Sequence, residues 1–293
     1  MFQFFANIFG YLLQILYEFV NNYGLAIILF TVIMKIILIP LSIKQQKTMK
    51  KSSELQEKMK VIQFKYKNDQ EKMNQEIMDL YKTEKMSPFS GCLTAIVQML
   101  LLLSIFYLVR SPITYMQKVP QENLNNYIQQ LKDGEKKVSD VYPEIDLIRE
   151  YEYLKEKNPE DENVDKLNIQ MNFLGLDLSK IPKENIGDLT VYIIPVLYII
   201  SSFISIRLTT SRQAKLNNKK QEKVEIDGET GEEIKEKNEV DNVMQTNKMM
   251  SLIMPIMSIS IAFIAPLGLA LYWLINNILM IIERLVLDKV IKA

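Results

Sequence analysis

The chain has 293 residues, its 35 Lys and Arg balance its 35 Asp and Glu, and its mean hydropathy of +0.01 alone would describe a soluble protein. It contains no His and one Cys, Cys92, which excludes His-based acid–base catalysis, His/Cys metal sites and intrachain disulfides. Since it also lacks a Gly-rich phosphate loop between a strand and a helix, we expect no enzymatic activity and no cofactor.

The first segment, residues 1–22, predicts an amphipathic helix that lies in the membrane interface. Its polar and small residues recur at spacings of three and four and trace one helical stripe, with Phe, Leu and Ile elsewhere. A sixth membrane span is the alternative, but the acidic residue on the stripe argues against full immersion. The stripe consists of Gln3, Asn7, Gly10, Gln14, Glu18 and Asn21.

Beyond residue 22, charged residues are strongly segregated from apolar ones. Charge concentrates in residues 44–85, 117–188 and 207–248. A bilayer core of about 30 Å requires about 20 mostly apolar residues in a helix. Five stretches meet this requirement and predict an all-α polytopic membrane protein with five transmembrane helices: 23–43, 88–109, 189–206, 249–265 and 267–287.

The segment between the first two spans, 44–87, predicts a helical hairpin. Two sets of apolar residues recur at helical spacing on either side of a polar turn at 67–69. Each helix is too short and too charged to bury much alone, so we expect the two to pair along their apolar sides. A solvated charged linker is the alternative. The two sets are Leu55, Met59, Ile62 and Tyr66, then Met73, Ile77, Leu80 and Tyr81.

The distribution of Lys and Arg predicts the orientation. Residues 44–85 hold eleven Lys against seven acids, and five basic residues follow the third span between 207 and 220, so both segments should be cytoplasmic. Residues 110–188 carry sixteen acids against eleven bases, which suits an extracytoplasmic location. This long acidic segment predicts either an added cap or a partly disordered loop. The N-terminus should lie outside, and the cytoplasmic loop 207–248 and tail 288–293 inside.

Lys35 lies deep within the first predicted span. A Lys near the centre of a membrane helix costs roughly 2.5 to 3.5 kcal/mol. No Asp or Glu lies well inside the five spans, and Glu283 stands only near the end of the fifth. We therefore expect Lys35 to face a hydrated cavity and to take its counterion from solvent, a lipid headgroup or an arriving molecule. A snorkelling or structural Lys is the alternative.

Polar side chains elsewhere in the spans support such a cavity. They recur at helical spacing in three spans, although small polar residues often serve only to pack membrane helices. Their convergence on one cationic site is the prediction. The three sets are Thr31, Lys35 and Ser42; Thr94 and Gln98; and Tyr198, Ser201, Ser202 and Ser205, while Tyr272, Trp273, Asn276 and Asn277 add polar groups to the last span.

Four motifs in this order resemble the YidC family of membrane protein insertases, also called the Oxa/YidC/Alb family. They are NYGLAIILFTVIMKIILIPLSIKQQKTMKK, SPFSGCLTAIVQMLLLLSIFYLV, NFLGLDLSK and NKMMSLIMPIMSISIAFIAPLGLALYWLINNILMIIERLV. The resemblance implies a small, five-span form without a large periplasmic domain, located in the bacterial plasma membrane. It implies a hydrophilic groove, open to the cytosol and to lipid, that holds one cation on the first span.

The resemblance also implies roles for particular residues. Lys35 matches the groove cation, which is Arg in most members, Trp273 matches an aromatic substrate-contacting position, and Gln98 matches a polar position of the second span. With the polar stripes, the predicted substrate-contacting groove consists of Lys35, Thr31, Gln98, Ser201, Ser202 and Trp273. Lys lacks the forked donors of Arg, so it should capture a carboxylate less tightly.

The predicted function is insertion and chaperoning of integral membrane proteins without nucleotide hydrolysis. The expected partners are nascent membrane proteins and the lipid bilayer, with the Sec translocon and the ribosome as further candidates, and no recognition of nucleic acid sequence. The chain ends without a long basic tail, so binding of the ribosome by such a tail is not carried over. The alternative is a small-anion transporter or channel with Lys35 as its selectivity charge. A structural membrane subunit is a third possibility.

Overall fold

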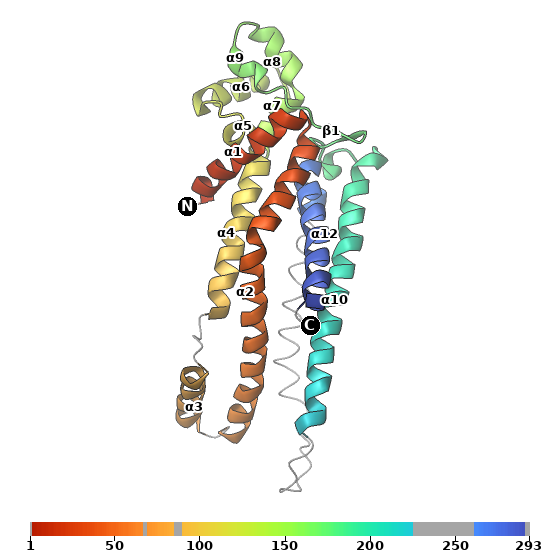
Figure 1. Cartoon of the computed structure of the whole chain (residues 1–293). Coiled ribbons are helices and arrows are strands. Elements are labelled where there is room, and N and C mark those ends of the chain that lie inside the picture. Colours follow the sequence, from red (N-terminus) through yellow and green to blue (C-terminus); the bar gives the residue numbers. More distant parts are fainter. Residues whose placement is uncertain (1, 67–68, 85–89, 225–260, 291–293) are drawn as a thin grey trace.

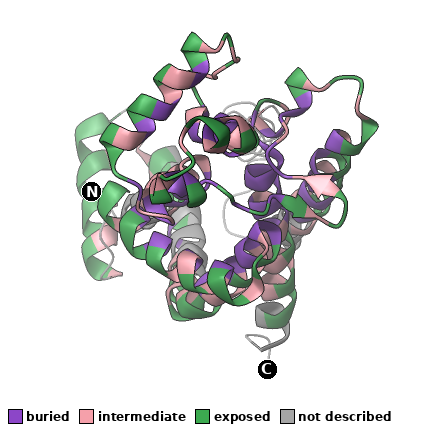
Figure 2. Cartoon of the chain, turned by 90° about the horizontal axis from the view of Figure 1, so that it is seen from above, coloured by how far each residue is buried: buried purple, intermediate pink, exposed green. Residues whose placement is uncertain are grey.

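In the part of the chain that the structure describes, four long helices run side by side, and smaller elements cover one end (Figure 1). The computed structural model describes residues 2–66, 69–84, 90–224 and 261–290. Seen from above, buried residues gather toward the middle of the molecule and exposed residues toward its rim (Figure 2). The four helices are α2 (Tyr23–Lys65), α4 (Ser90–Arg110), α10 (Ile193–Val224) and α12 (Leu267–Val290).

Three helices in the described part of the chain are long and apolar enough to cross a membrane. Their apolar segments are Tyr23–Gln45, Leu189–Leu208 and Leu267–Val286, and a shorter apolar stretch, Met99–Arg110, lies in α4. The described chain is mostly helical, in agreement with the predicted all-α membrane protein, while the five transmembrane helices and the groove stay predictions. Of the predicted fourth span, 249–265, only residues 261–265 are among the described residues.

Helix α2 is longer than the predicted first span. It continues for 43 residues, so the span and the first arm of the predicted hairpin form one helix. Between Pro40, which lies inside α2, and Tyr66 the chain contains no further Pro and no Gly, and residues 44–65 are rich in Lys, Gln, Glu and Met, which favour helix. The helix begins at Asn22, whose side-chain oxygen accepts a hydrogen bond from the Leu25 amide at 3.1 Å.

The second arm of the hairpin is α3 (Gln70–Thr83), which lies beside the far end of α2 (Figure 1). Asp69 caps α3 by accepting a hydrogen bond from the Lys72 amide at 3.0 Å. An ion pair between Lys58 and Glu84 joins the two arms, but no α3 side chain is fully buried. The arms therefore meet through partly exposed contacts.

Helix α1 (Phe2–Val20) crosses the upper ends of α2 and α4 at a slant (Figure 1). One face packs inward, where the Phe9 ring meets the Phe30 ring of α2 at a centroid distance of 6.0 Å. On the predicted polar stripe, Gly10 presses against the Tyr115 carbonyl, where a β-carbon would overlap it. A second face exposes large apolar side chains: Phe4, Ile8, Tyr11, Ile15 and Phe19. The interfacial location of α1 stays a prediction.

Residues 111–192 fold into a cap over the upper end of the helices, so of the two alternatives for the acidic segment the structure has the folded one. Its core contains Leu124, Tyr127, Leu131, Leu147 and Leu154. Its elements are α5 (Pro112–Tyr115), α6 (Gln121–Asp133), α7 (Pro143–Arg149), α8 (Tyr151–Lys157), α9 (Glu162–Asp165), the strands β1 (Asn172–Phe173) and β2 (Leu176–Asp177), and the 3₁₀ turns η1 (Pro182–Glu184) and η2 (Leu189–Tyr192).

A buried carboxylate joins two of the cap helices. Glu144 of α7 accepts hydrogen bonds from the amide and the hydroxyl of Thr114 in α5, at 2.9 and 2.7 Å. Burial raises the pKa of the Glu144 carboxyl, although the hydrogen bonds from Thr114 oppose the rise.

The cap also fixes the starting points of α2 and α12. The Tyr23 amide donates to the Gln170 carbonyl at 3.0 Å, and the Gly268 amide donates to the Leu178 carbonyl at 2.9 Å. Between these two acceptors the β1–β2 hairpin turns at Leu174 and Gly175, which both have positive φ. One short segment of the cap therefore holds the first turns of two helices that are about 240 residues apart in sequence.

Candidate functional site

Lys35 lies on α2 within the first span, and its ammonium is paired inside the chain. Its Nζ is 3.3 Å from Oε2 of Glu283 on α12. The other carboxylate oxygen of Glu283 accepts a hydrogen bond from the hydroxyl of Ser42, which also lies on α2. The exposed fraction is 24% for the Lys35 side chain and 14% for that of Glu283. We call Lys35, Ser42 and Glu283 the Lys35 cluster.

The parallel course of α2 and α12 explains why these residues meet. Gly268, at the start of α12, lies against the ring of Tyr23, at the start of α2. At 1.5 Å per residue, Lys35 lies about 18 Å along α2 from Tyr23, and Ser42 about 28 Å. Glu283 lies about 22 Å along α12 from Gly268, between those two levels. The long Lys side chain can therefore reach the carboxylate from one side while Ser42 reaches it from the other.

The expectation that Lys35 lacks a counterion within the chain was wrong. Glu283 stands near the end of its own span, and its sequence position alone suggested that it lies too far from Lys35. The relative height of α2 and α12 and the length of the Lys side chain together place an oxygen of Glu283 3.3 Å from Nζ of Lys35. A partly buried cation is thereby paired, as its desolvation requires.

The other residues predicted around Lys35 differ in their surroundings. Thr31, one turn earlier on α2, is buried, and its hydroxyl donates to the Ile27 carbonyl of the same helix at 2.6 Å. Gln98 belongs to α4, but its side chain lies outside the described residues. The Thr31 hydroxyl is therefore engaged within its own helix rather than with the Lys35 cluster, and a role for Gln98 stays a prediction.

Ser201 and Ser202 belong to a second polar contact, between α10 and α12. The amide nitrogen of Asn277 donates to their hydroxyls at 3.0 and 3.1 Å, and all three side chains are buried. Ser201 in turn donates to the Tyr198 carbonyl at 2.8 Å. These hydroxyls contact Asn277 rather than the Lys35 cluster, so contact with a substrate stays a prediction for both serines.

Trp273 lies one turn before Asn277 on α12 and is partly buried. Its ring meets the Tyr198 ring of α10 at a centroid distance of 6.2 Å and an interplanar angle of 35°. Contact of this ring with a substrate stays a prediction.

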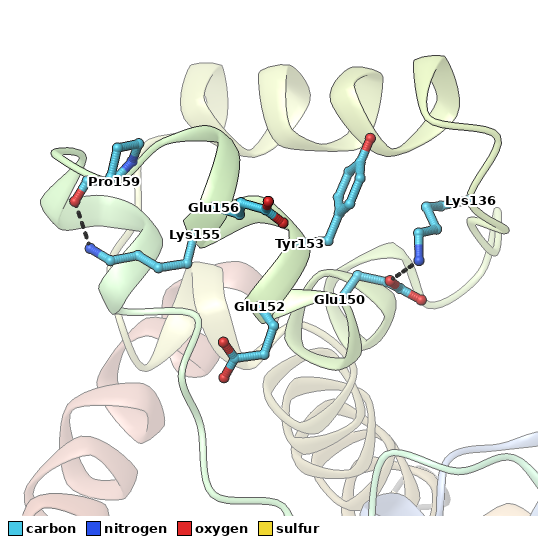
Figure 3. A pocket seen from close by; sticks show the side chains of 7 residues that line it. All are labelled: Lys136, Glu150, Glu152, Tyr153, Lys155, Glu156 and Pro159. Carbon is cyan, nitrogen blue, oxygen red and sulfur yellow. Dashed lines mark hydrogen bonds and ion pairs between the residues drawn. The ribbon is translucent and has the colours of Figure 1, made fainter.

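A depression lies on the surface of the cap, and Figure 3 shows its lining side chains. It measures about 570 Å³ and carries two lysines among several acids. Lys136 pairs with Glu150 at 2.9 Å, and Lys155 pairs with Asp165 at 2.6 Å. Both ammonium groups are therefore engaged by carboxylates, and the depression offers no unpaired cation among its lining residues to an acidic ligand.

Two residues that matter here were not among the predicted site residues. Glu283 and Asn277 are six residues apart on α12, which places them on different faces of that helix. Asn277 faces α10 and Glu283 faces α2. The spacing was visible in the sequence, but which neighbouring helix each face meets was not.

Comparison with known proteins identifies the family of the chain. A family model described as the 60Kd inner membrane protein matches residues 15–293, nearly the whole chain. The chain belongs to the 60Kd inner membrane protein family. This family is that of YidC and Oxa1, so the resemblance drawn from the four motifs is confirmed. Membership of this family does not favour the alternative function, a small-anion transporter.

Several proteins similar to this chain carry the name membrane protein insertase YidC. One from Geobacter metallireducens is 50% identical over 86 residues, 29% of this chain and 16% of the relative. One from Cupriavidus necator is 42% identical over 103 residues, 35% of this chain and 19% of the relative. One from Fusobacterium nucleatum is 40% identical over 104 residues, 36% of this chain and 51% of the relative. The matched regions thus span about half of a relative's length or less.

Proposed function

We propose that this protein inserts integral membrane proteins into the bacterial plasma membrane and helps them to fold, without hydrolysing nucleotides. Membership of the 60Kd inner membrane protein family and the names of its relatives support this function. The observation that carries it is the place of Lys35. This residue puts a cation in the middle of an apolar helix, and its side chain is only partly buried.

The proposed architecture has five transmembrane helices around a hydrophilic groove. The groove opens to the cytosol and to lipid, with the N-terminus of the chain outside and the C-terminus inside. Three apolar helices of the described chain, the shorter apolar stretch of α4 and the apolar composition of 249–265 support this arrangement. The hairpin of residues 44–87 then lies in the cytoplasm, where it receives clients, and the cap lies outside.

The mechanism is physical rather than covalent. A hydrated groove that reaches partway across the bilayer shortens the apolar barrier for a polar tail of the client, and Lys35 offers the acids of that tail an attractive contact. The apolar helix of the client then moves sideways into lipid, and its burial there stabilises the product by roughly 25 cal/mol per Å². Tails with many charges exceed what one cation can offset.

A reconstituted insertion assay tests the function. Liposomes with and without the purified protein receive a single-span client with a short acidic N-terminal tail, and protection of the tail from added protease reports insertion. We expect protection to depend on the protein and to need no nucleotide. Equal protection in liposomes with and without the protein would refute the proposal.

A further inference from the structure

The Lys35 cluster carries an inference that rests on the proposed function. We infer that Glu283 is a resident counterion of Lys35, which an acidic client segment must displace before it can bind the ammonium. Glu283 is thus a specificity-determining residue: it reduces the advantage of acidic tails over neutral ones.

The first support is chemical identity. A client Asp or Glu presents the same group that Glu283 already presents to Lys35, so the two carboxylates compete for one ammonium. Glu283 is partly exposed and so is Lys35, which allows a competing carboxylate to approach. A groove cation that is already paired attracts acidic tails less strongly than a free cation would.

The second support is the geometry of the pair. The Nζ to Oε2 distance of 3.3 Å is longer than the 2.7 to 2.9 Å typical of a strong charge-assisted hydrogen bond. Lys makes no bidentate contact, so it can exchange one carboxylate for another without breaking a forked arrangement. The pair is therefore suited to exchange.

The third support is Ser42, which gives the displaced carboxylate a place to stay. Its hydroxyl binds the oxygen of Glu283 that does not face Lys35. When a client carboxylate takes the ammonium, Glu283 keeps this hydrogen bond and is not left without a donor. Leaving a partly buried carboxylate with no donor would make the exchange more costly.

Glu283→Gln tests the inference, because it removes the competing charge, preserves the side-chain volume and keeps an oxygen for Ser42. Two clients that differ only in their tails, one with two Asp and one with two Asn, are inserted into proteoliposomes. The measured quantity is the ratio of the initial insertion rates, acidic over neutral. We expect the variant to raise this ratio about threefold or more, as loss of one partly exposed ion pair allows.

The matched control is Glu122→Gln, which removes one exposed acid from the cap and should leave the ratio unchanged. Ser42→Ala is a second variant that alters neither charge; because it removes the donor that the displaced Glu283 would keep, we expect it to lower the ratio below the wild-type value. Combining Glu283→Gln with Lys35→Gln should abolish the gain.

The outcomes are distinct. A higher ratio in Glu283→Gln that disappears in the double variant supports the inference. An unchanged ratio, whether both clients insert at the wild-type rate or both slow down equally, overturns it, because Glu283 then acts only as a clamp between α2 and α12. Failure of the wild-type protein to insert either client would instead refute the proposed function.

Discussion

The side-chain amide of Asn277 on α12 lies 3.0 Å from the hydroxyl of Ser201 on α10, inside the helix bundle. With the neighbouring bond to Ser202, this contact joins two membrane helices through polar groups. Interhelical hydrogen bonds in membranes contribute about 0.6 kcal/mol on average and up to about 1.7 kcal/mol.

We expect Asn277→Ala to destabilise the protein by about 1 kcal/mol, because it removes both of these bonds and leaves a small cavity. Reversible unfolding in mixed micelles measures the change. Asn276→Ala is the control, because Asn276 is only partly buried, and it should cost less. Equal losses for the two variants would contradict a specific role for the α10–α12 contact.

The charge at position 35 is expected to matter for insertion. Lys35→Arg should retain it, Lys35→Gln should weaken it, and Lys35→Glu should be worst, because it places a second carboxylate beside Glu283. For an acidic-tailed client we expect Lys35→Gln to slow insertion about tenfold, the effect of losing a charged hydrogen bond worth roughly 1.5 kcal/mol.

The decisive comparison uses Lys35→Leu. Alone, this change leaves Glu283 without its cation, so loss of stability could mimic loss of function. The double variant Lys35→Leu, Glu283→Gln removes both charges and is the better test at matched protein levels. If it inserts acidic-tailed and neutral-tailed clients at the wild-type rate, capture by charge is not how this protein works.

Water access to Lys35 gives a further expectation. In a background with Cys92→Ser, a Cys at position 35 should react with a small aqueous thiol reagent from the cytoplasmic side. Ile36→Cys is the matched control, because the adjacent side chain points outward with 61% of its area exposed and should face lipid. A rate at position 35 no faster than at position 36 would argue against a hydrated groove.

Glu144 predicts a pH dependence for the cap. The pKa of Glu144 in the folded protein is raised above the ordinary value of 4.5, mainly by burial. Between the unfolded-state pKa and this higher folded-state pKa, the folded protein binds more protons than the unfolded chain. Stability therefore falls as pH rises through that window. We expect Glu144→Gln to weaken this dependence, as measured by unfolding temperature in detergent at about pH 4.5 and about pH 8. If the unfolding temperature of Glu144→Gln depends on pH as steeply as that of the control Glu122→Gln, Glu144 is not the source of the pH dependence.

The sequence predicted the helices better than their contacts. Spans such as 23–43 and 267–287 follow from hydropathy, because the thickness of the bilayer sets a length that composition alone reveals. The pair between Lys35 and Glu283 does not follow, because it depends on the relative height of α2 and α12. That height is set by backbone bonds to Gln170 and Leu178 in the cap.

Similar reasoning explains the serines of α10. Periodicity correctly placed Ser201 and Ser205 on one face, and both are buried. It could not distinguish a face that borders a groove from one that packs on a neighbour. The difference lies in Asn277, which is about 75 residues away in sequence and supplies the donor.

The continuity of α2 has a mechanical consequence. The helix carries Lys35 and the first arm of the hairpin in one uninterrupted rod of 43 residues, about 64 Å long. Pro40 lacks one backbone hydrogen bond, which permits bending, but the bonds on either side resist twisting of one part against the other. A torque applied to the hairpin about the α2 axis would therefore turn Lys35 as well and alter the contact between its ammonium and Glu283.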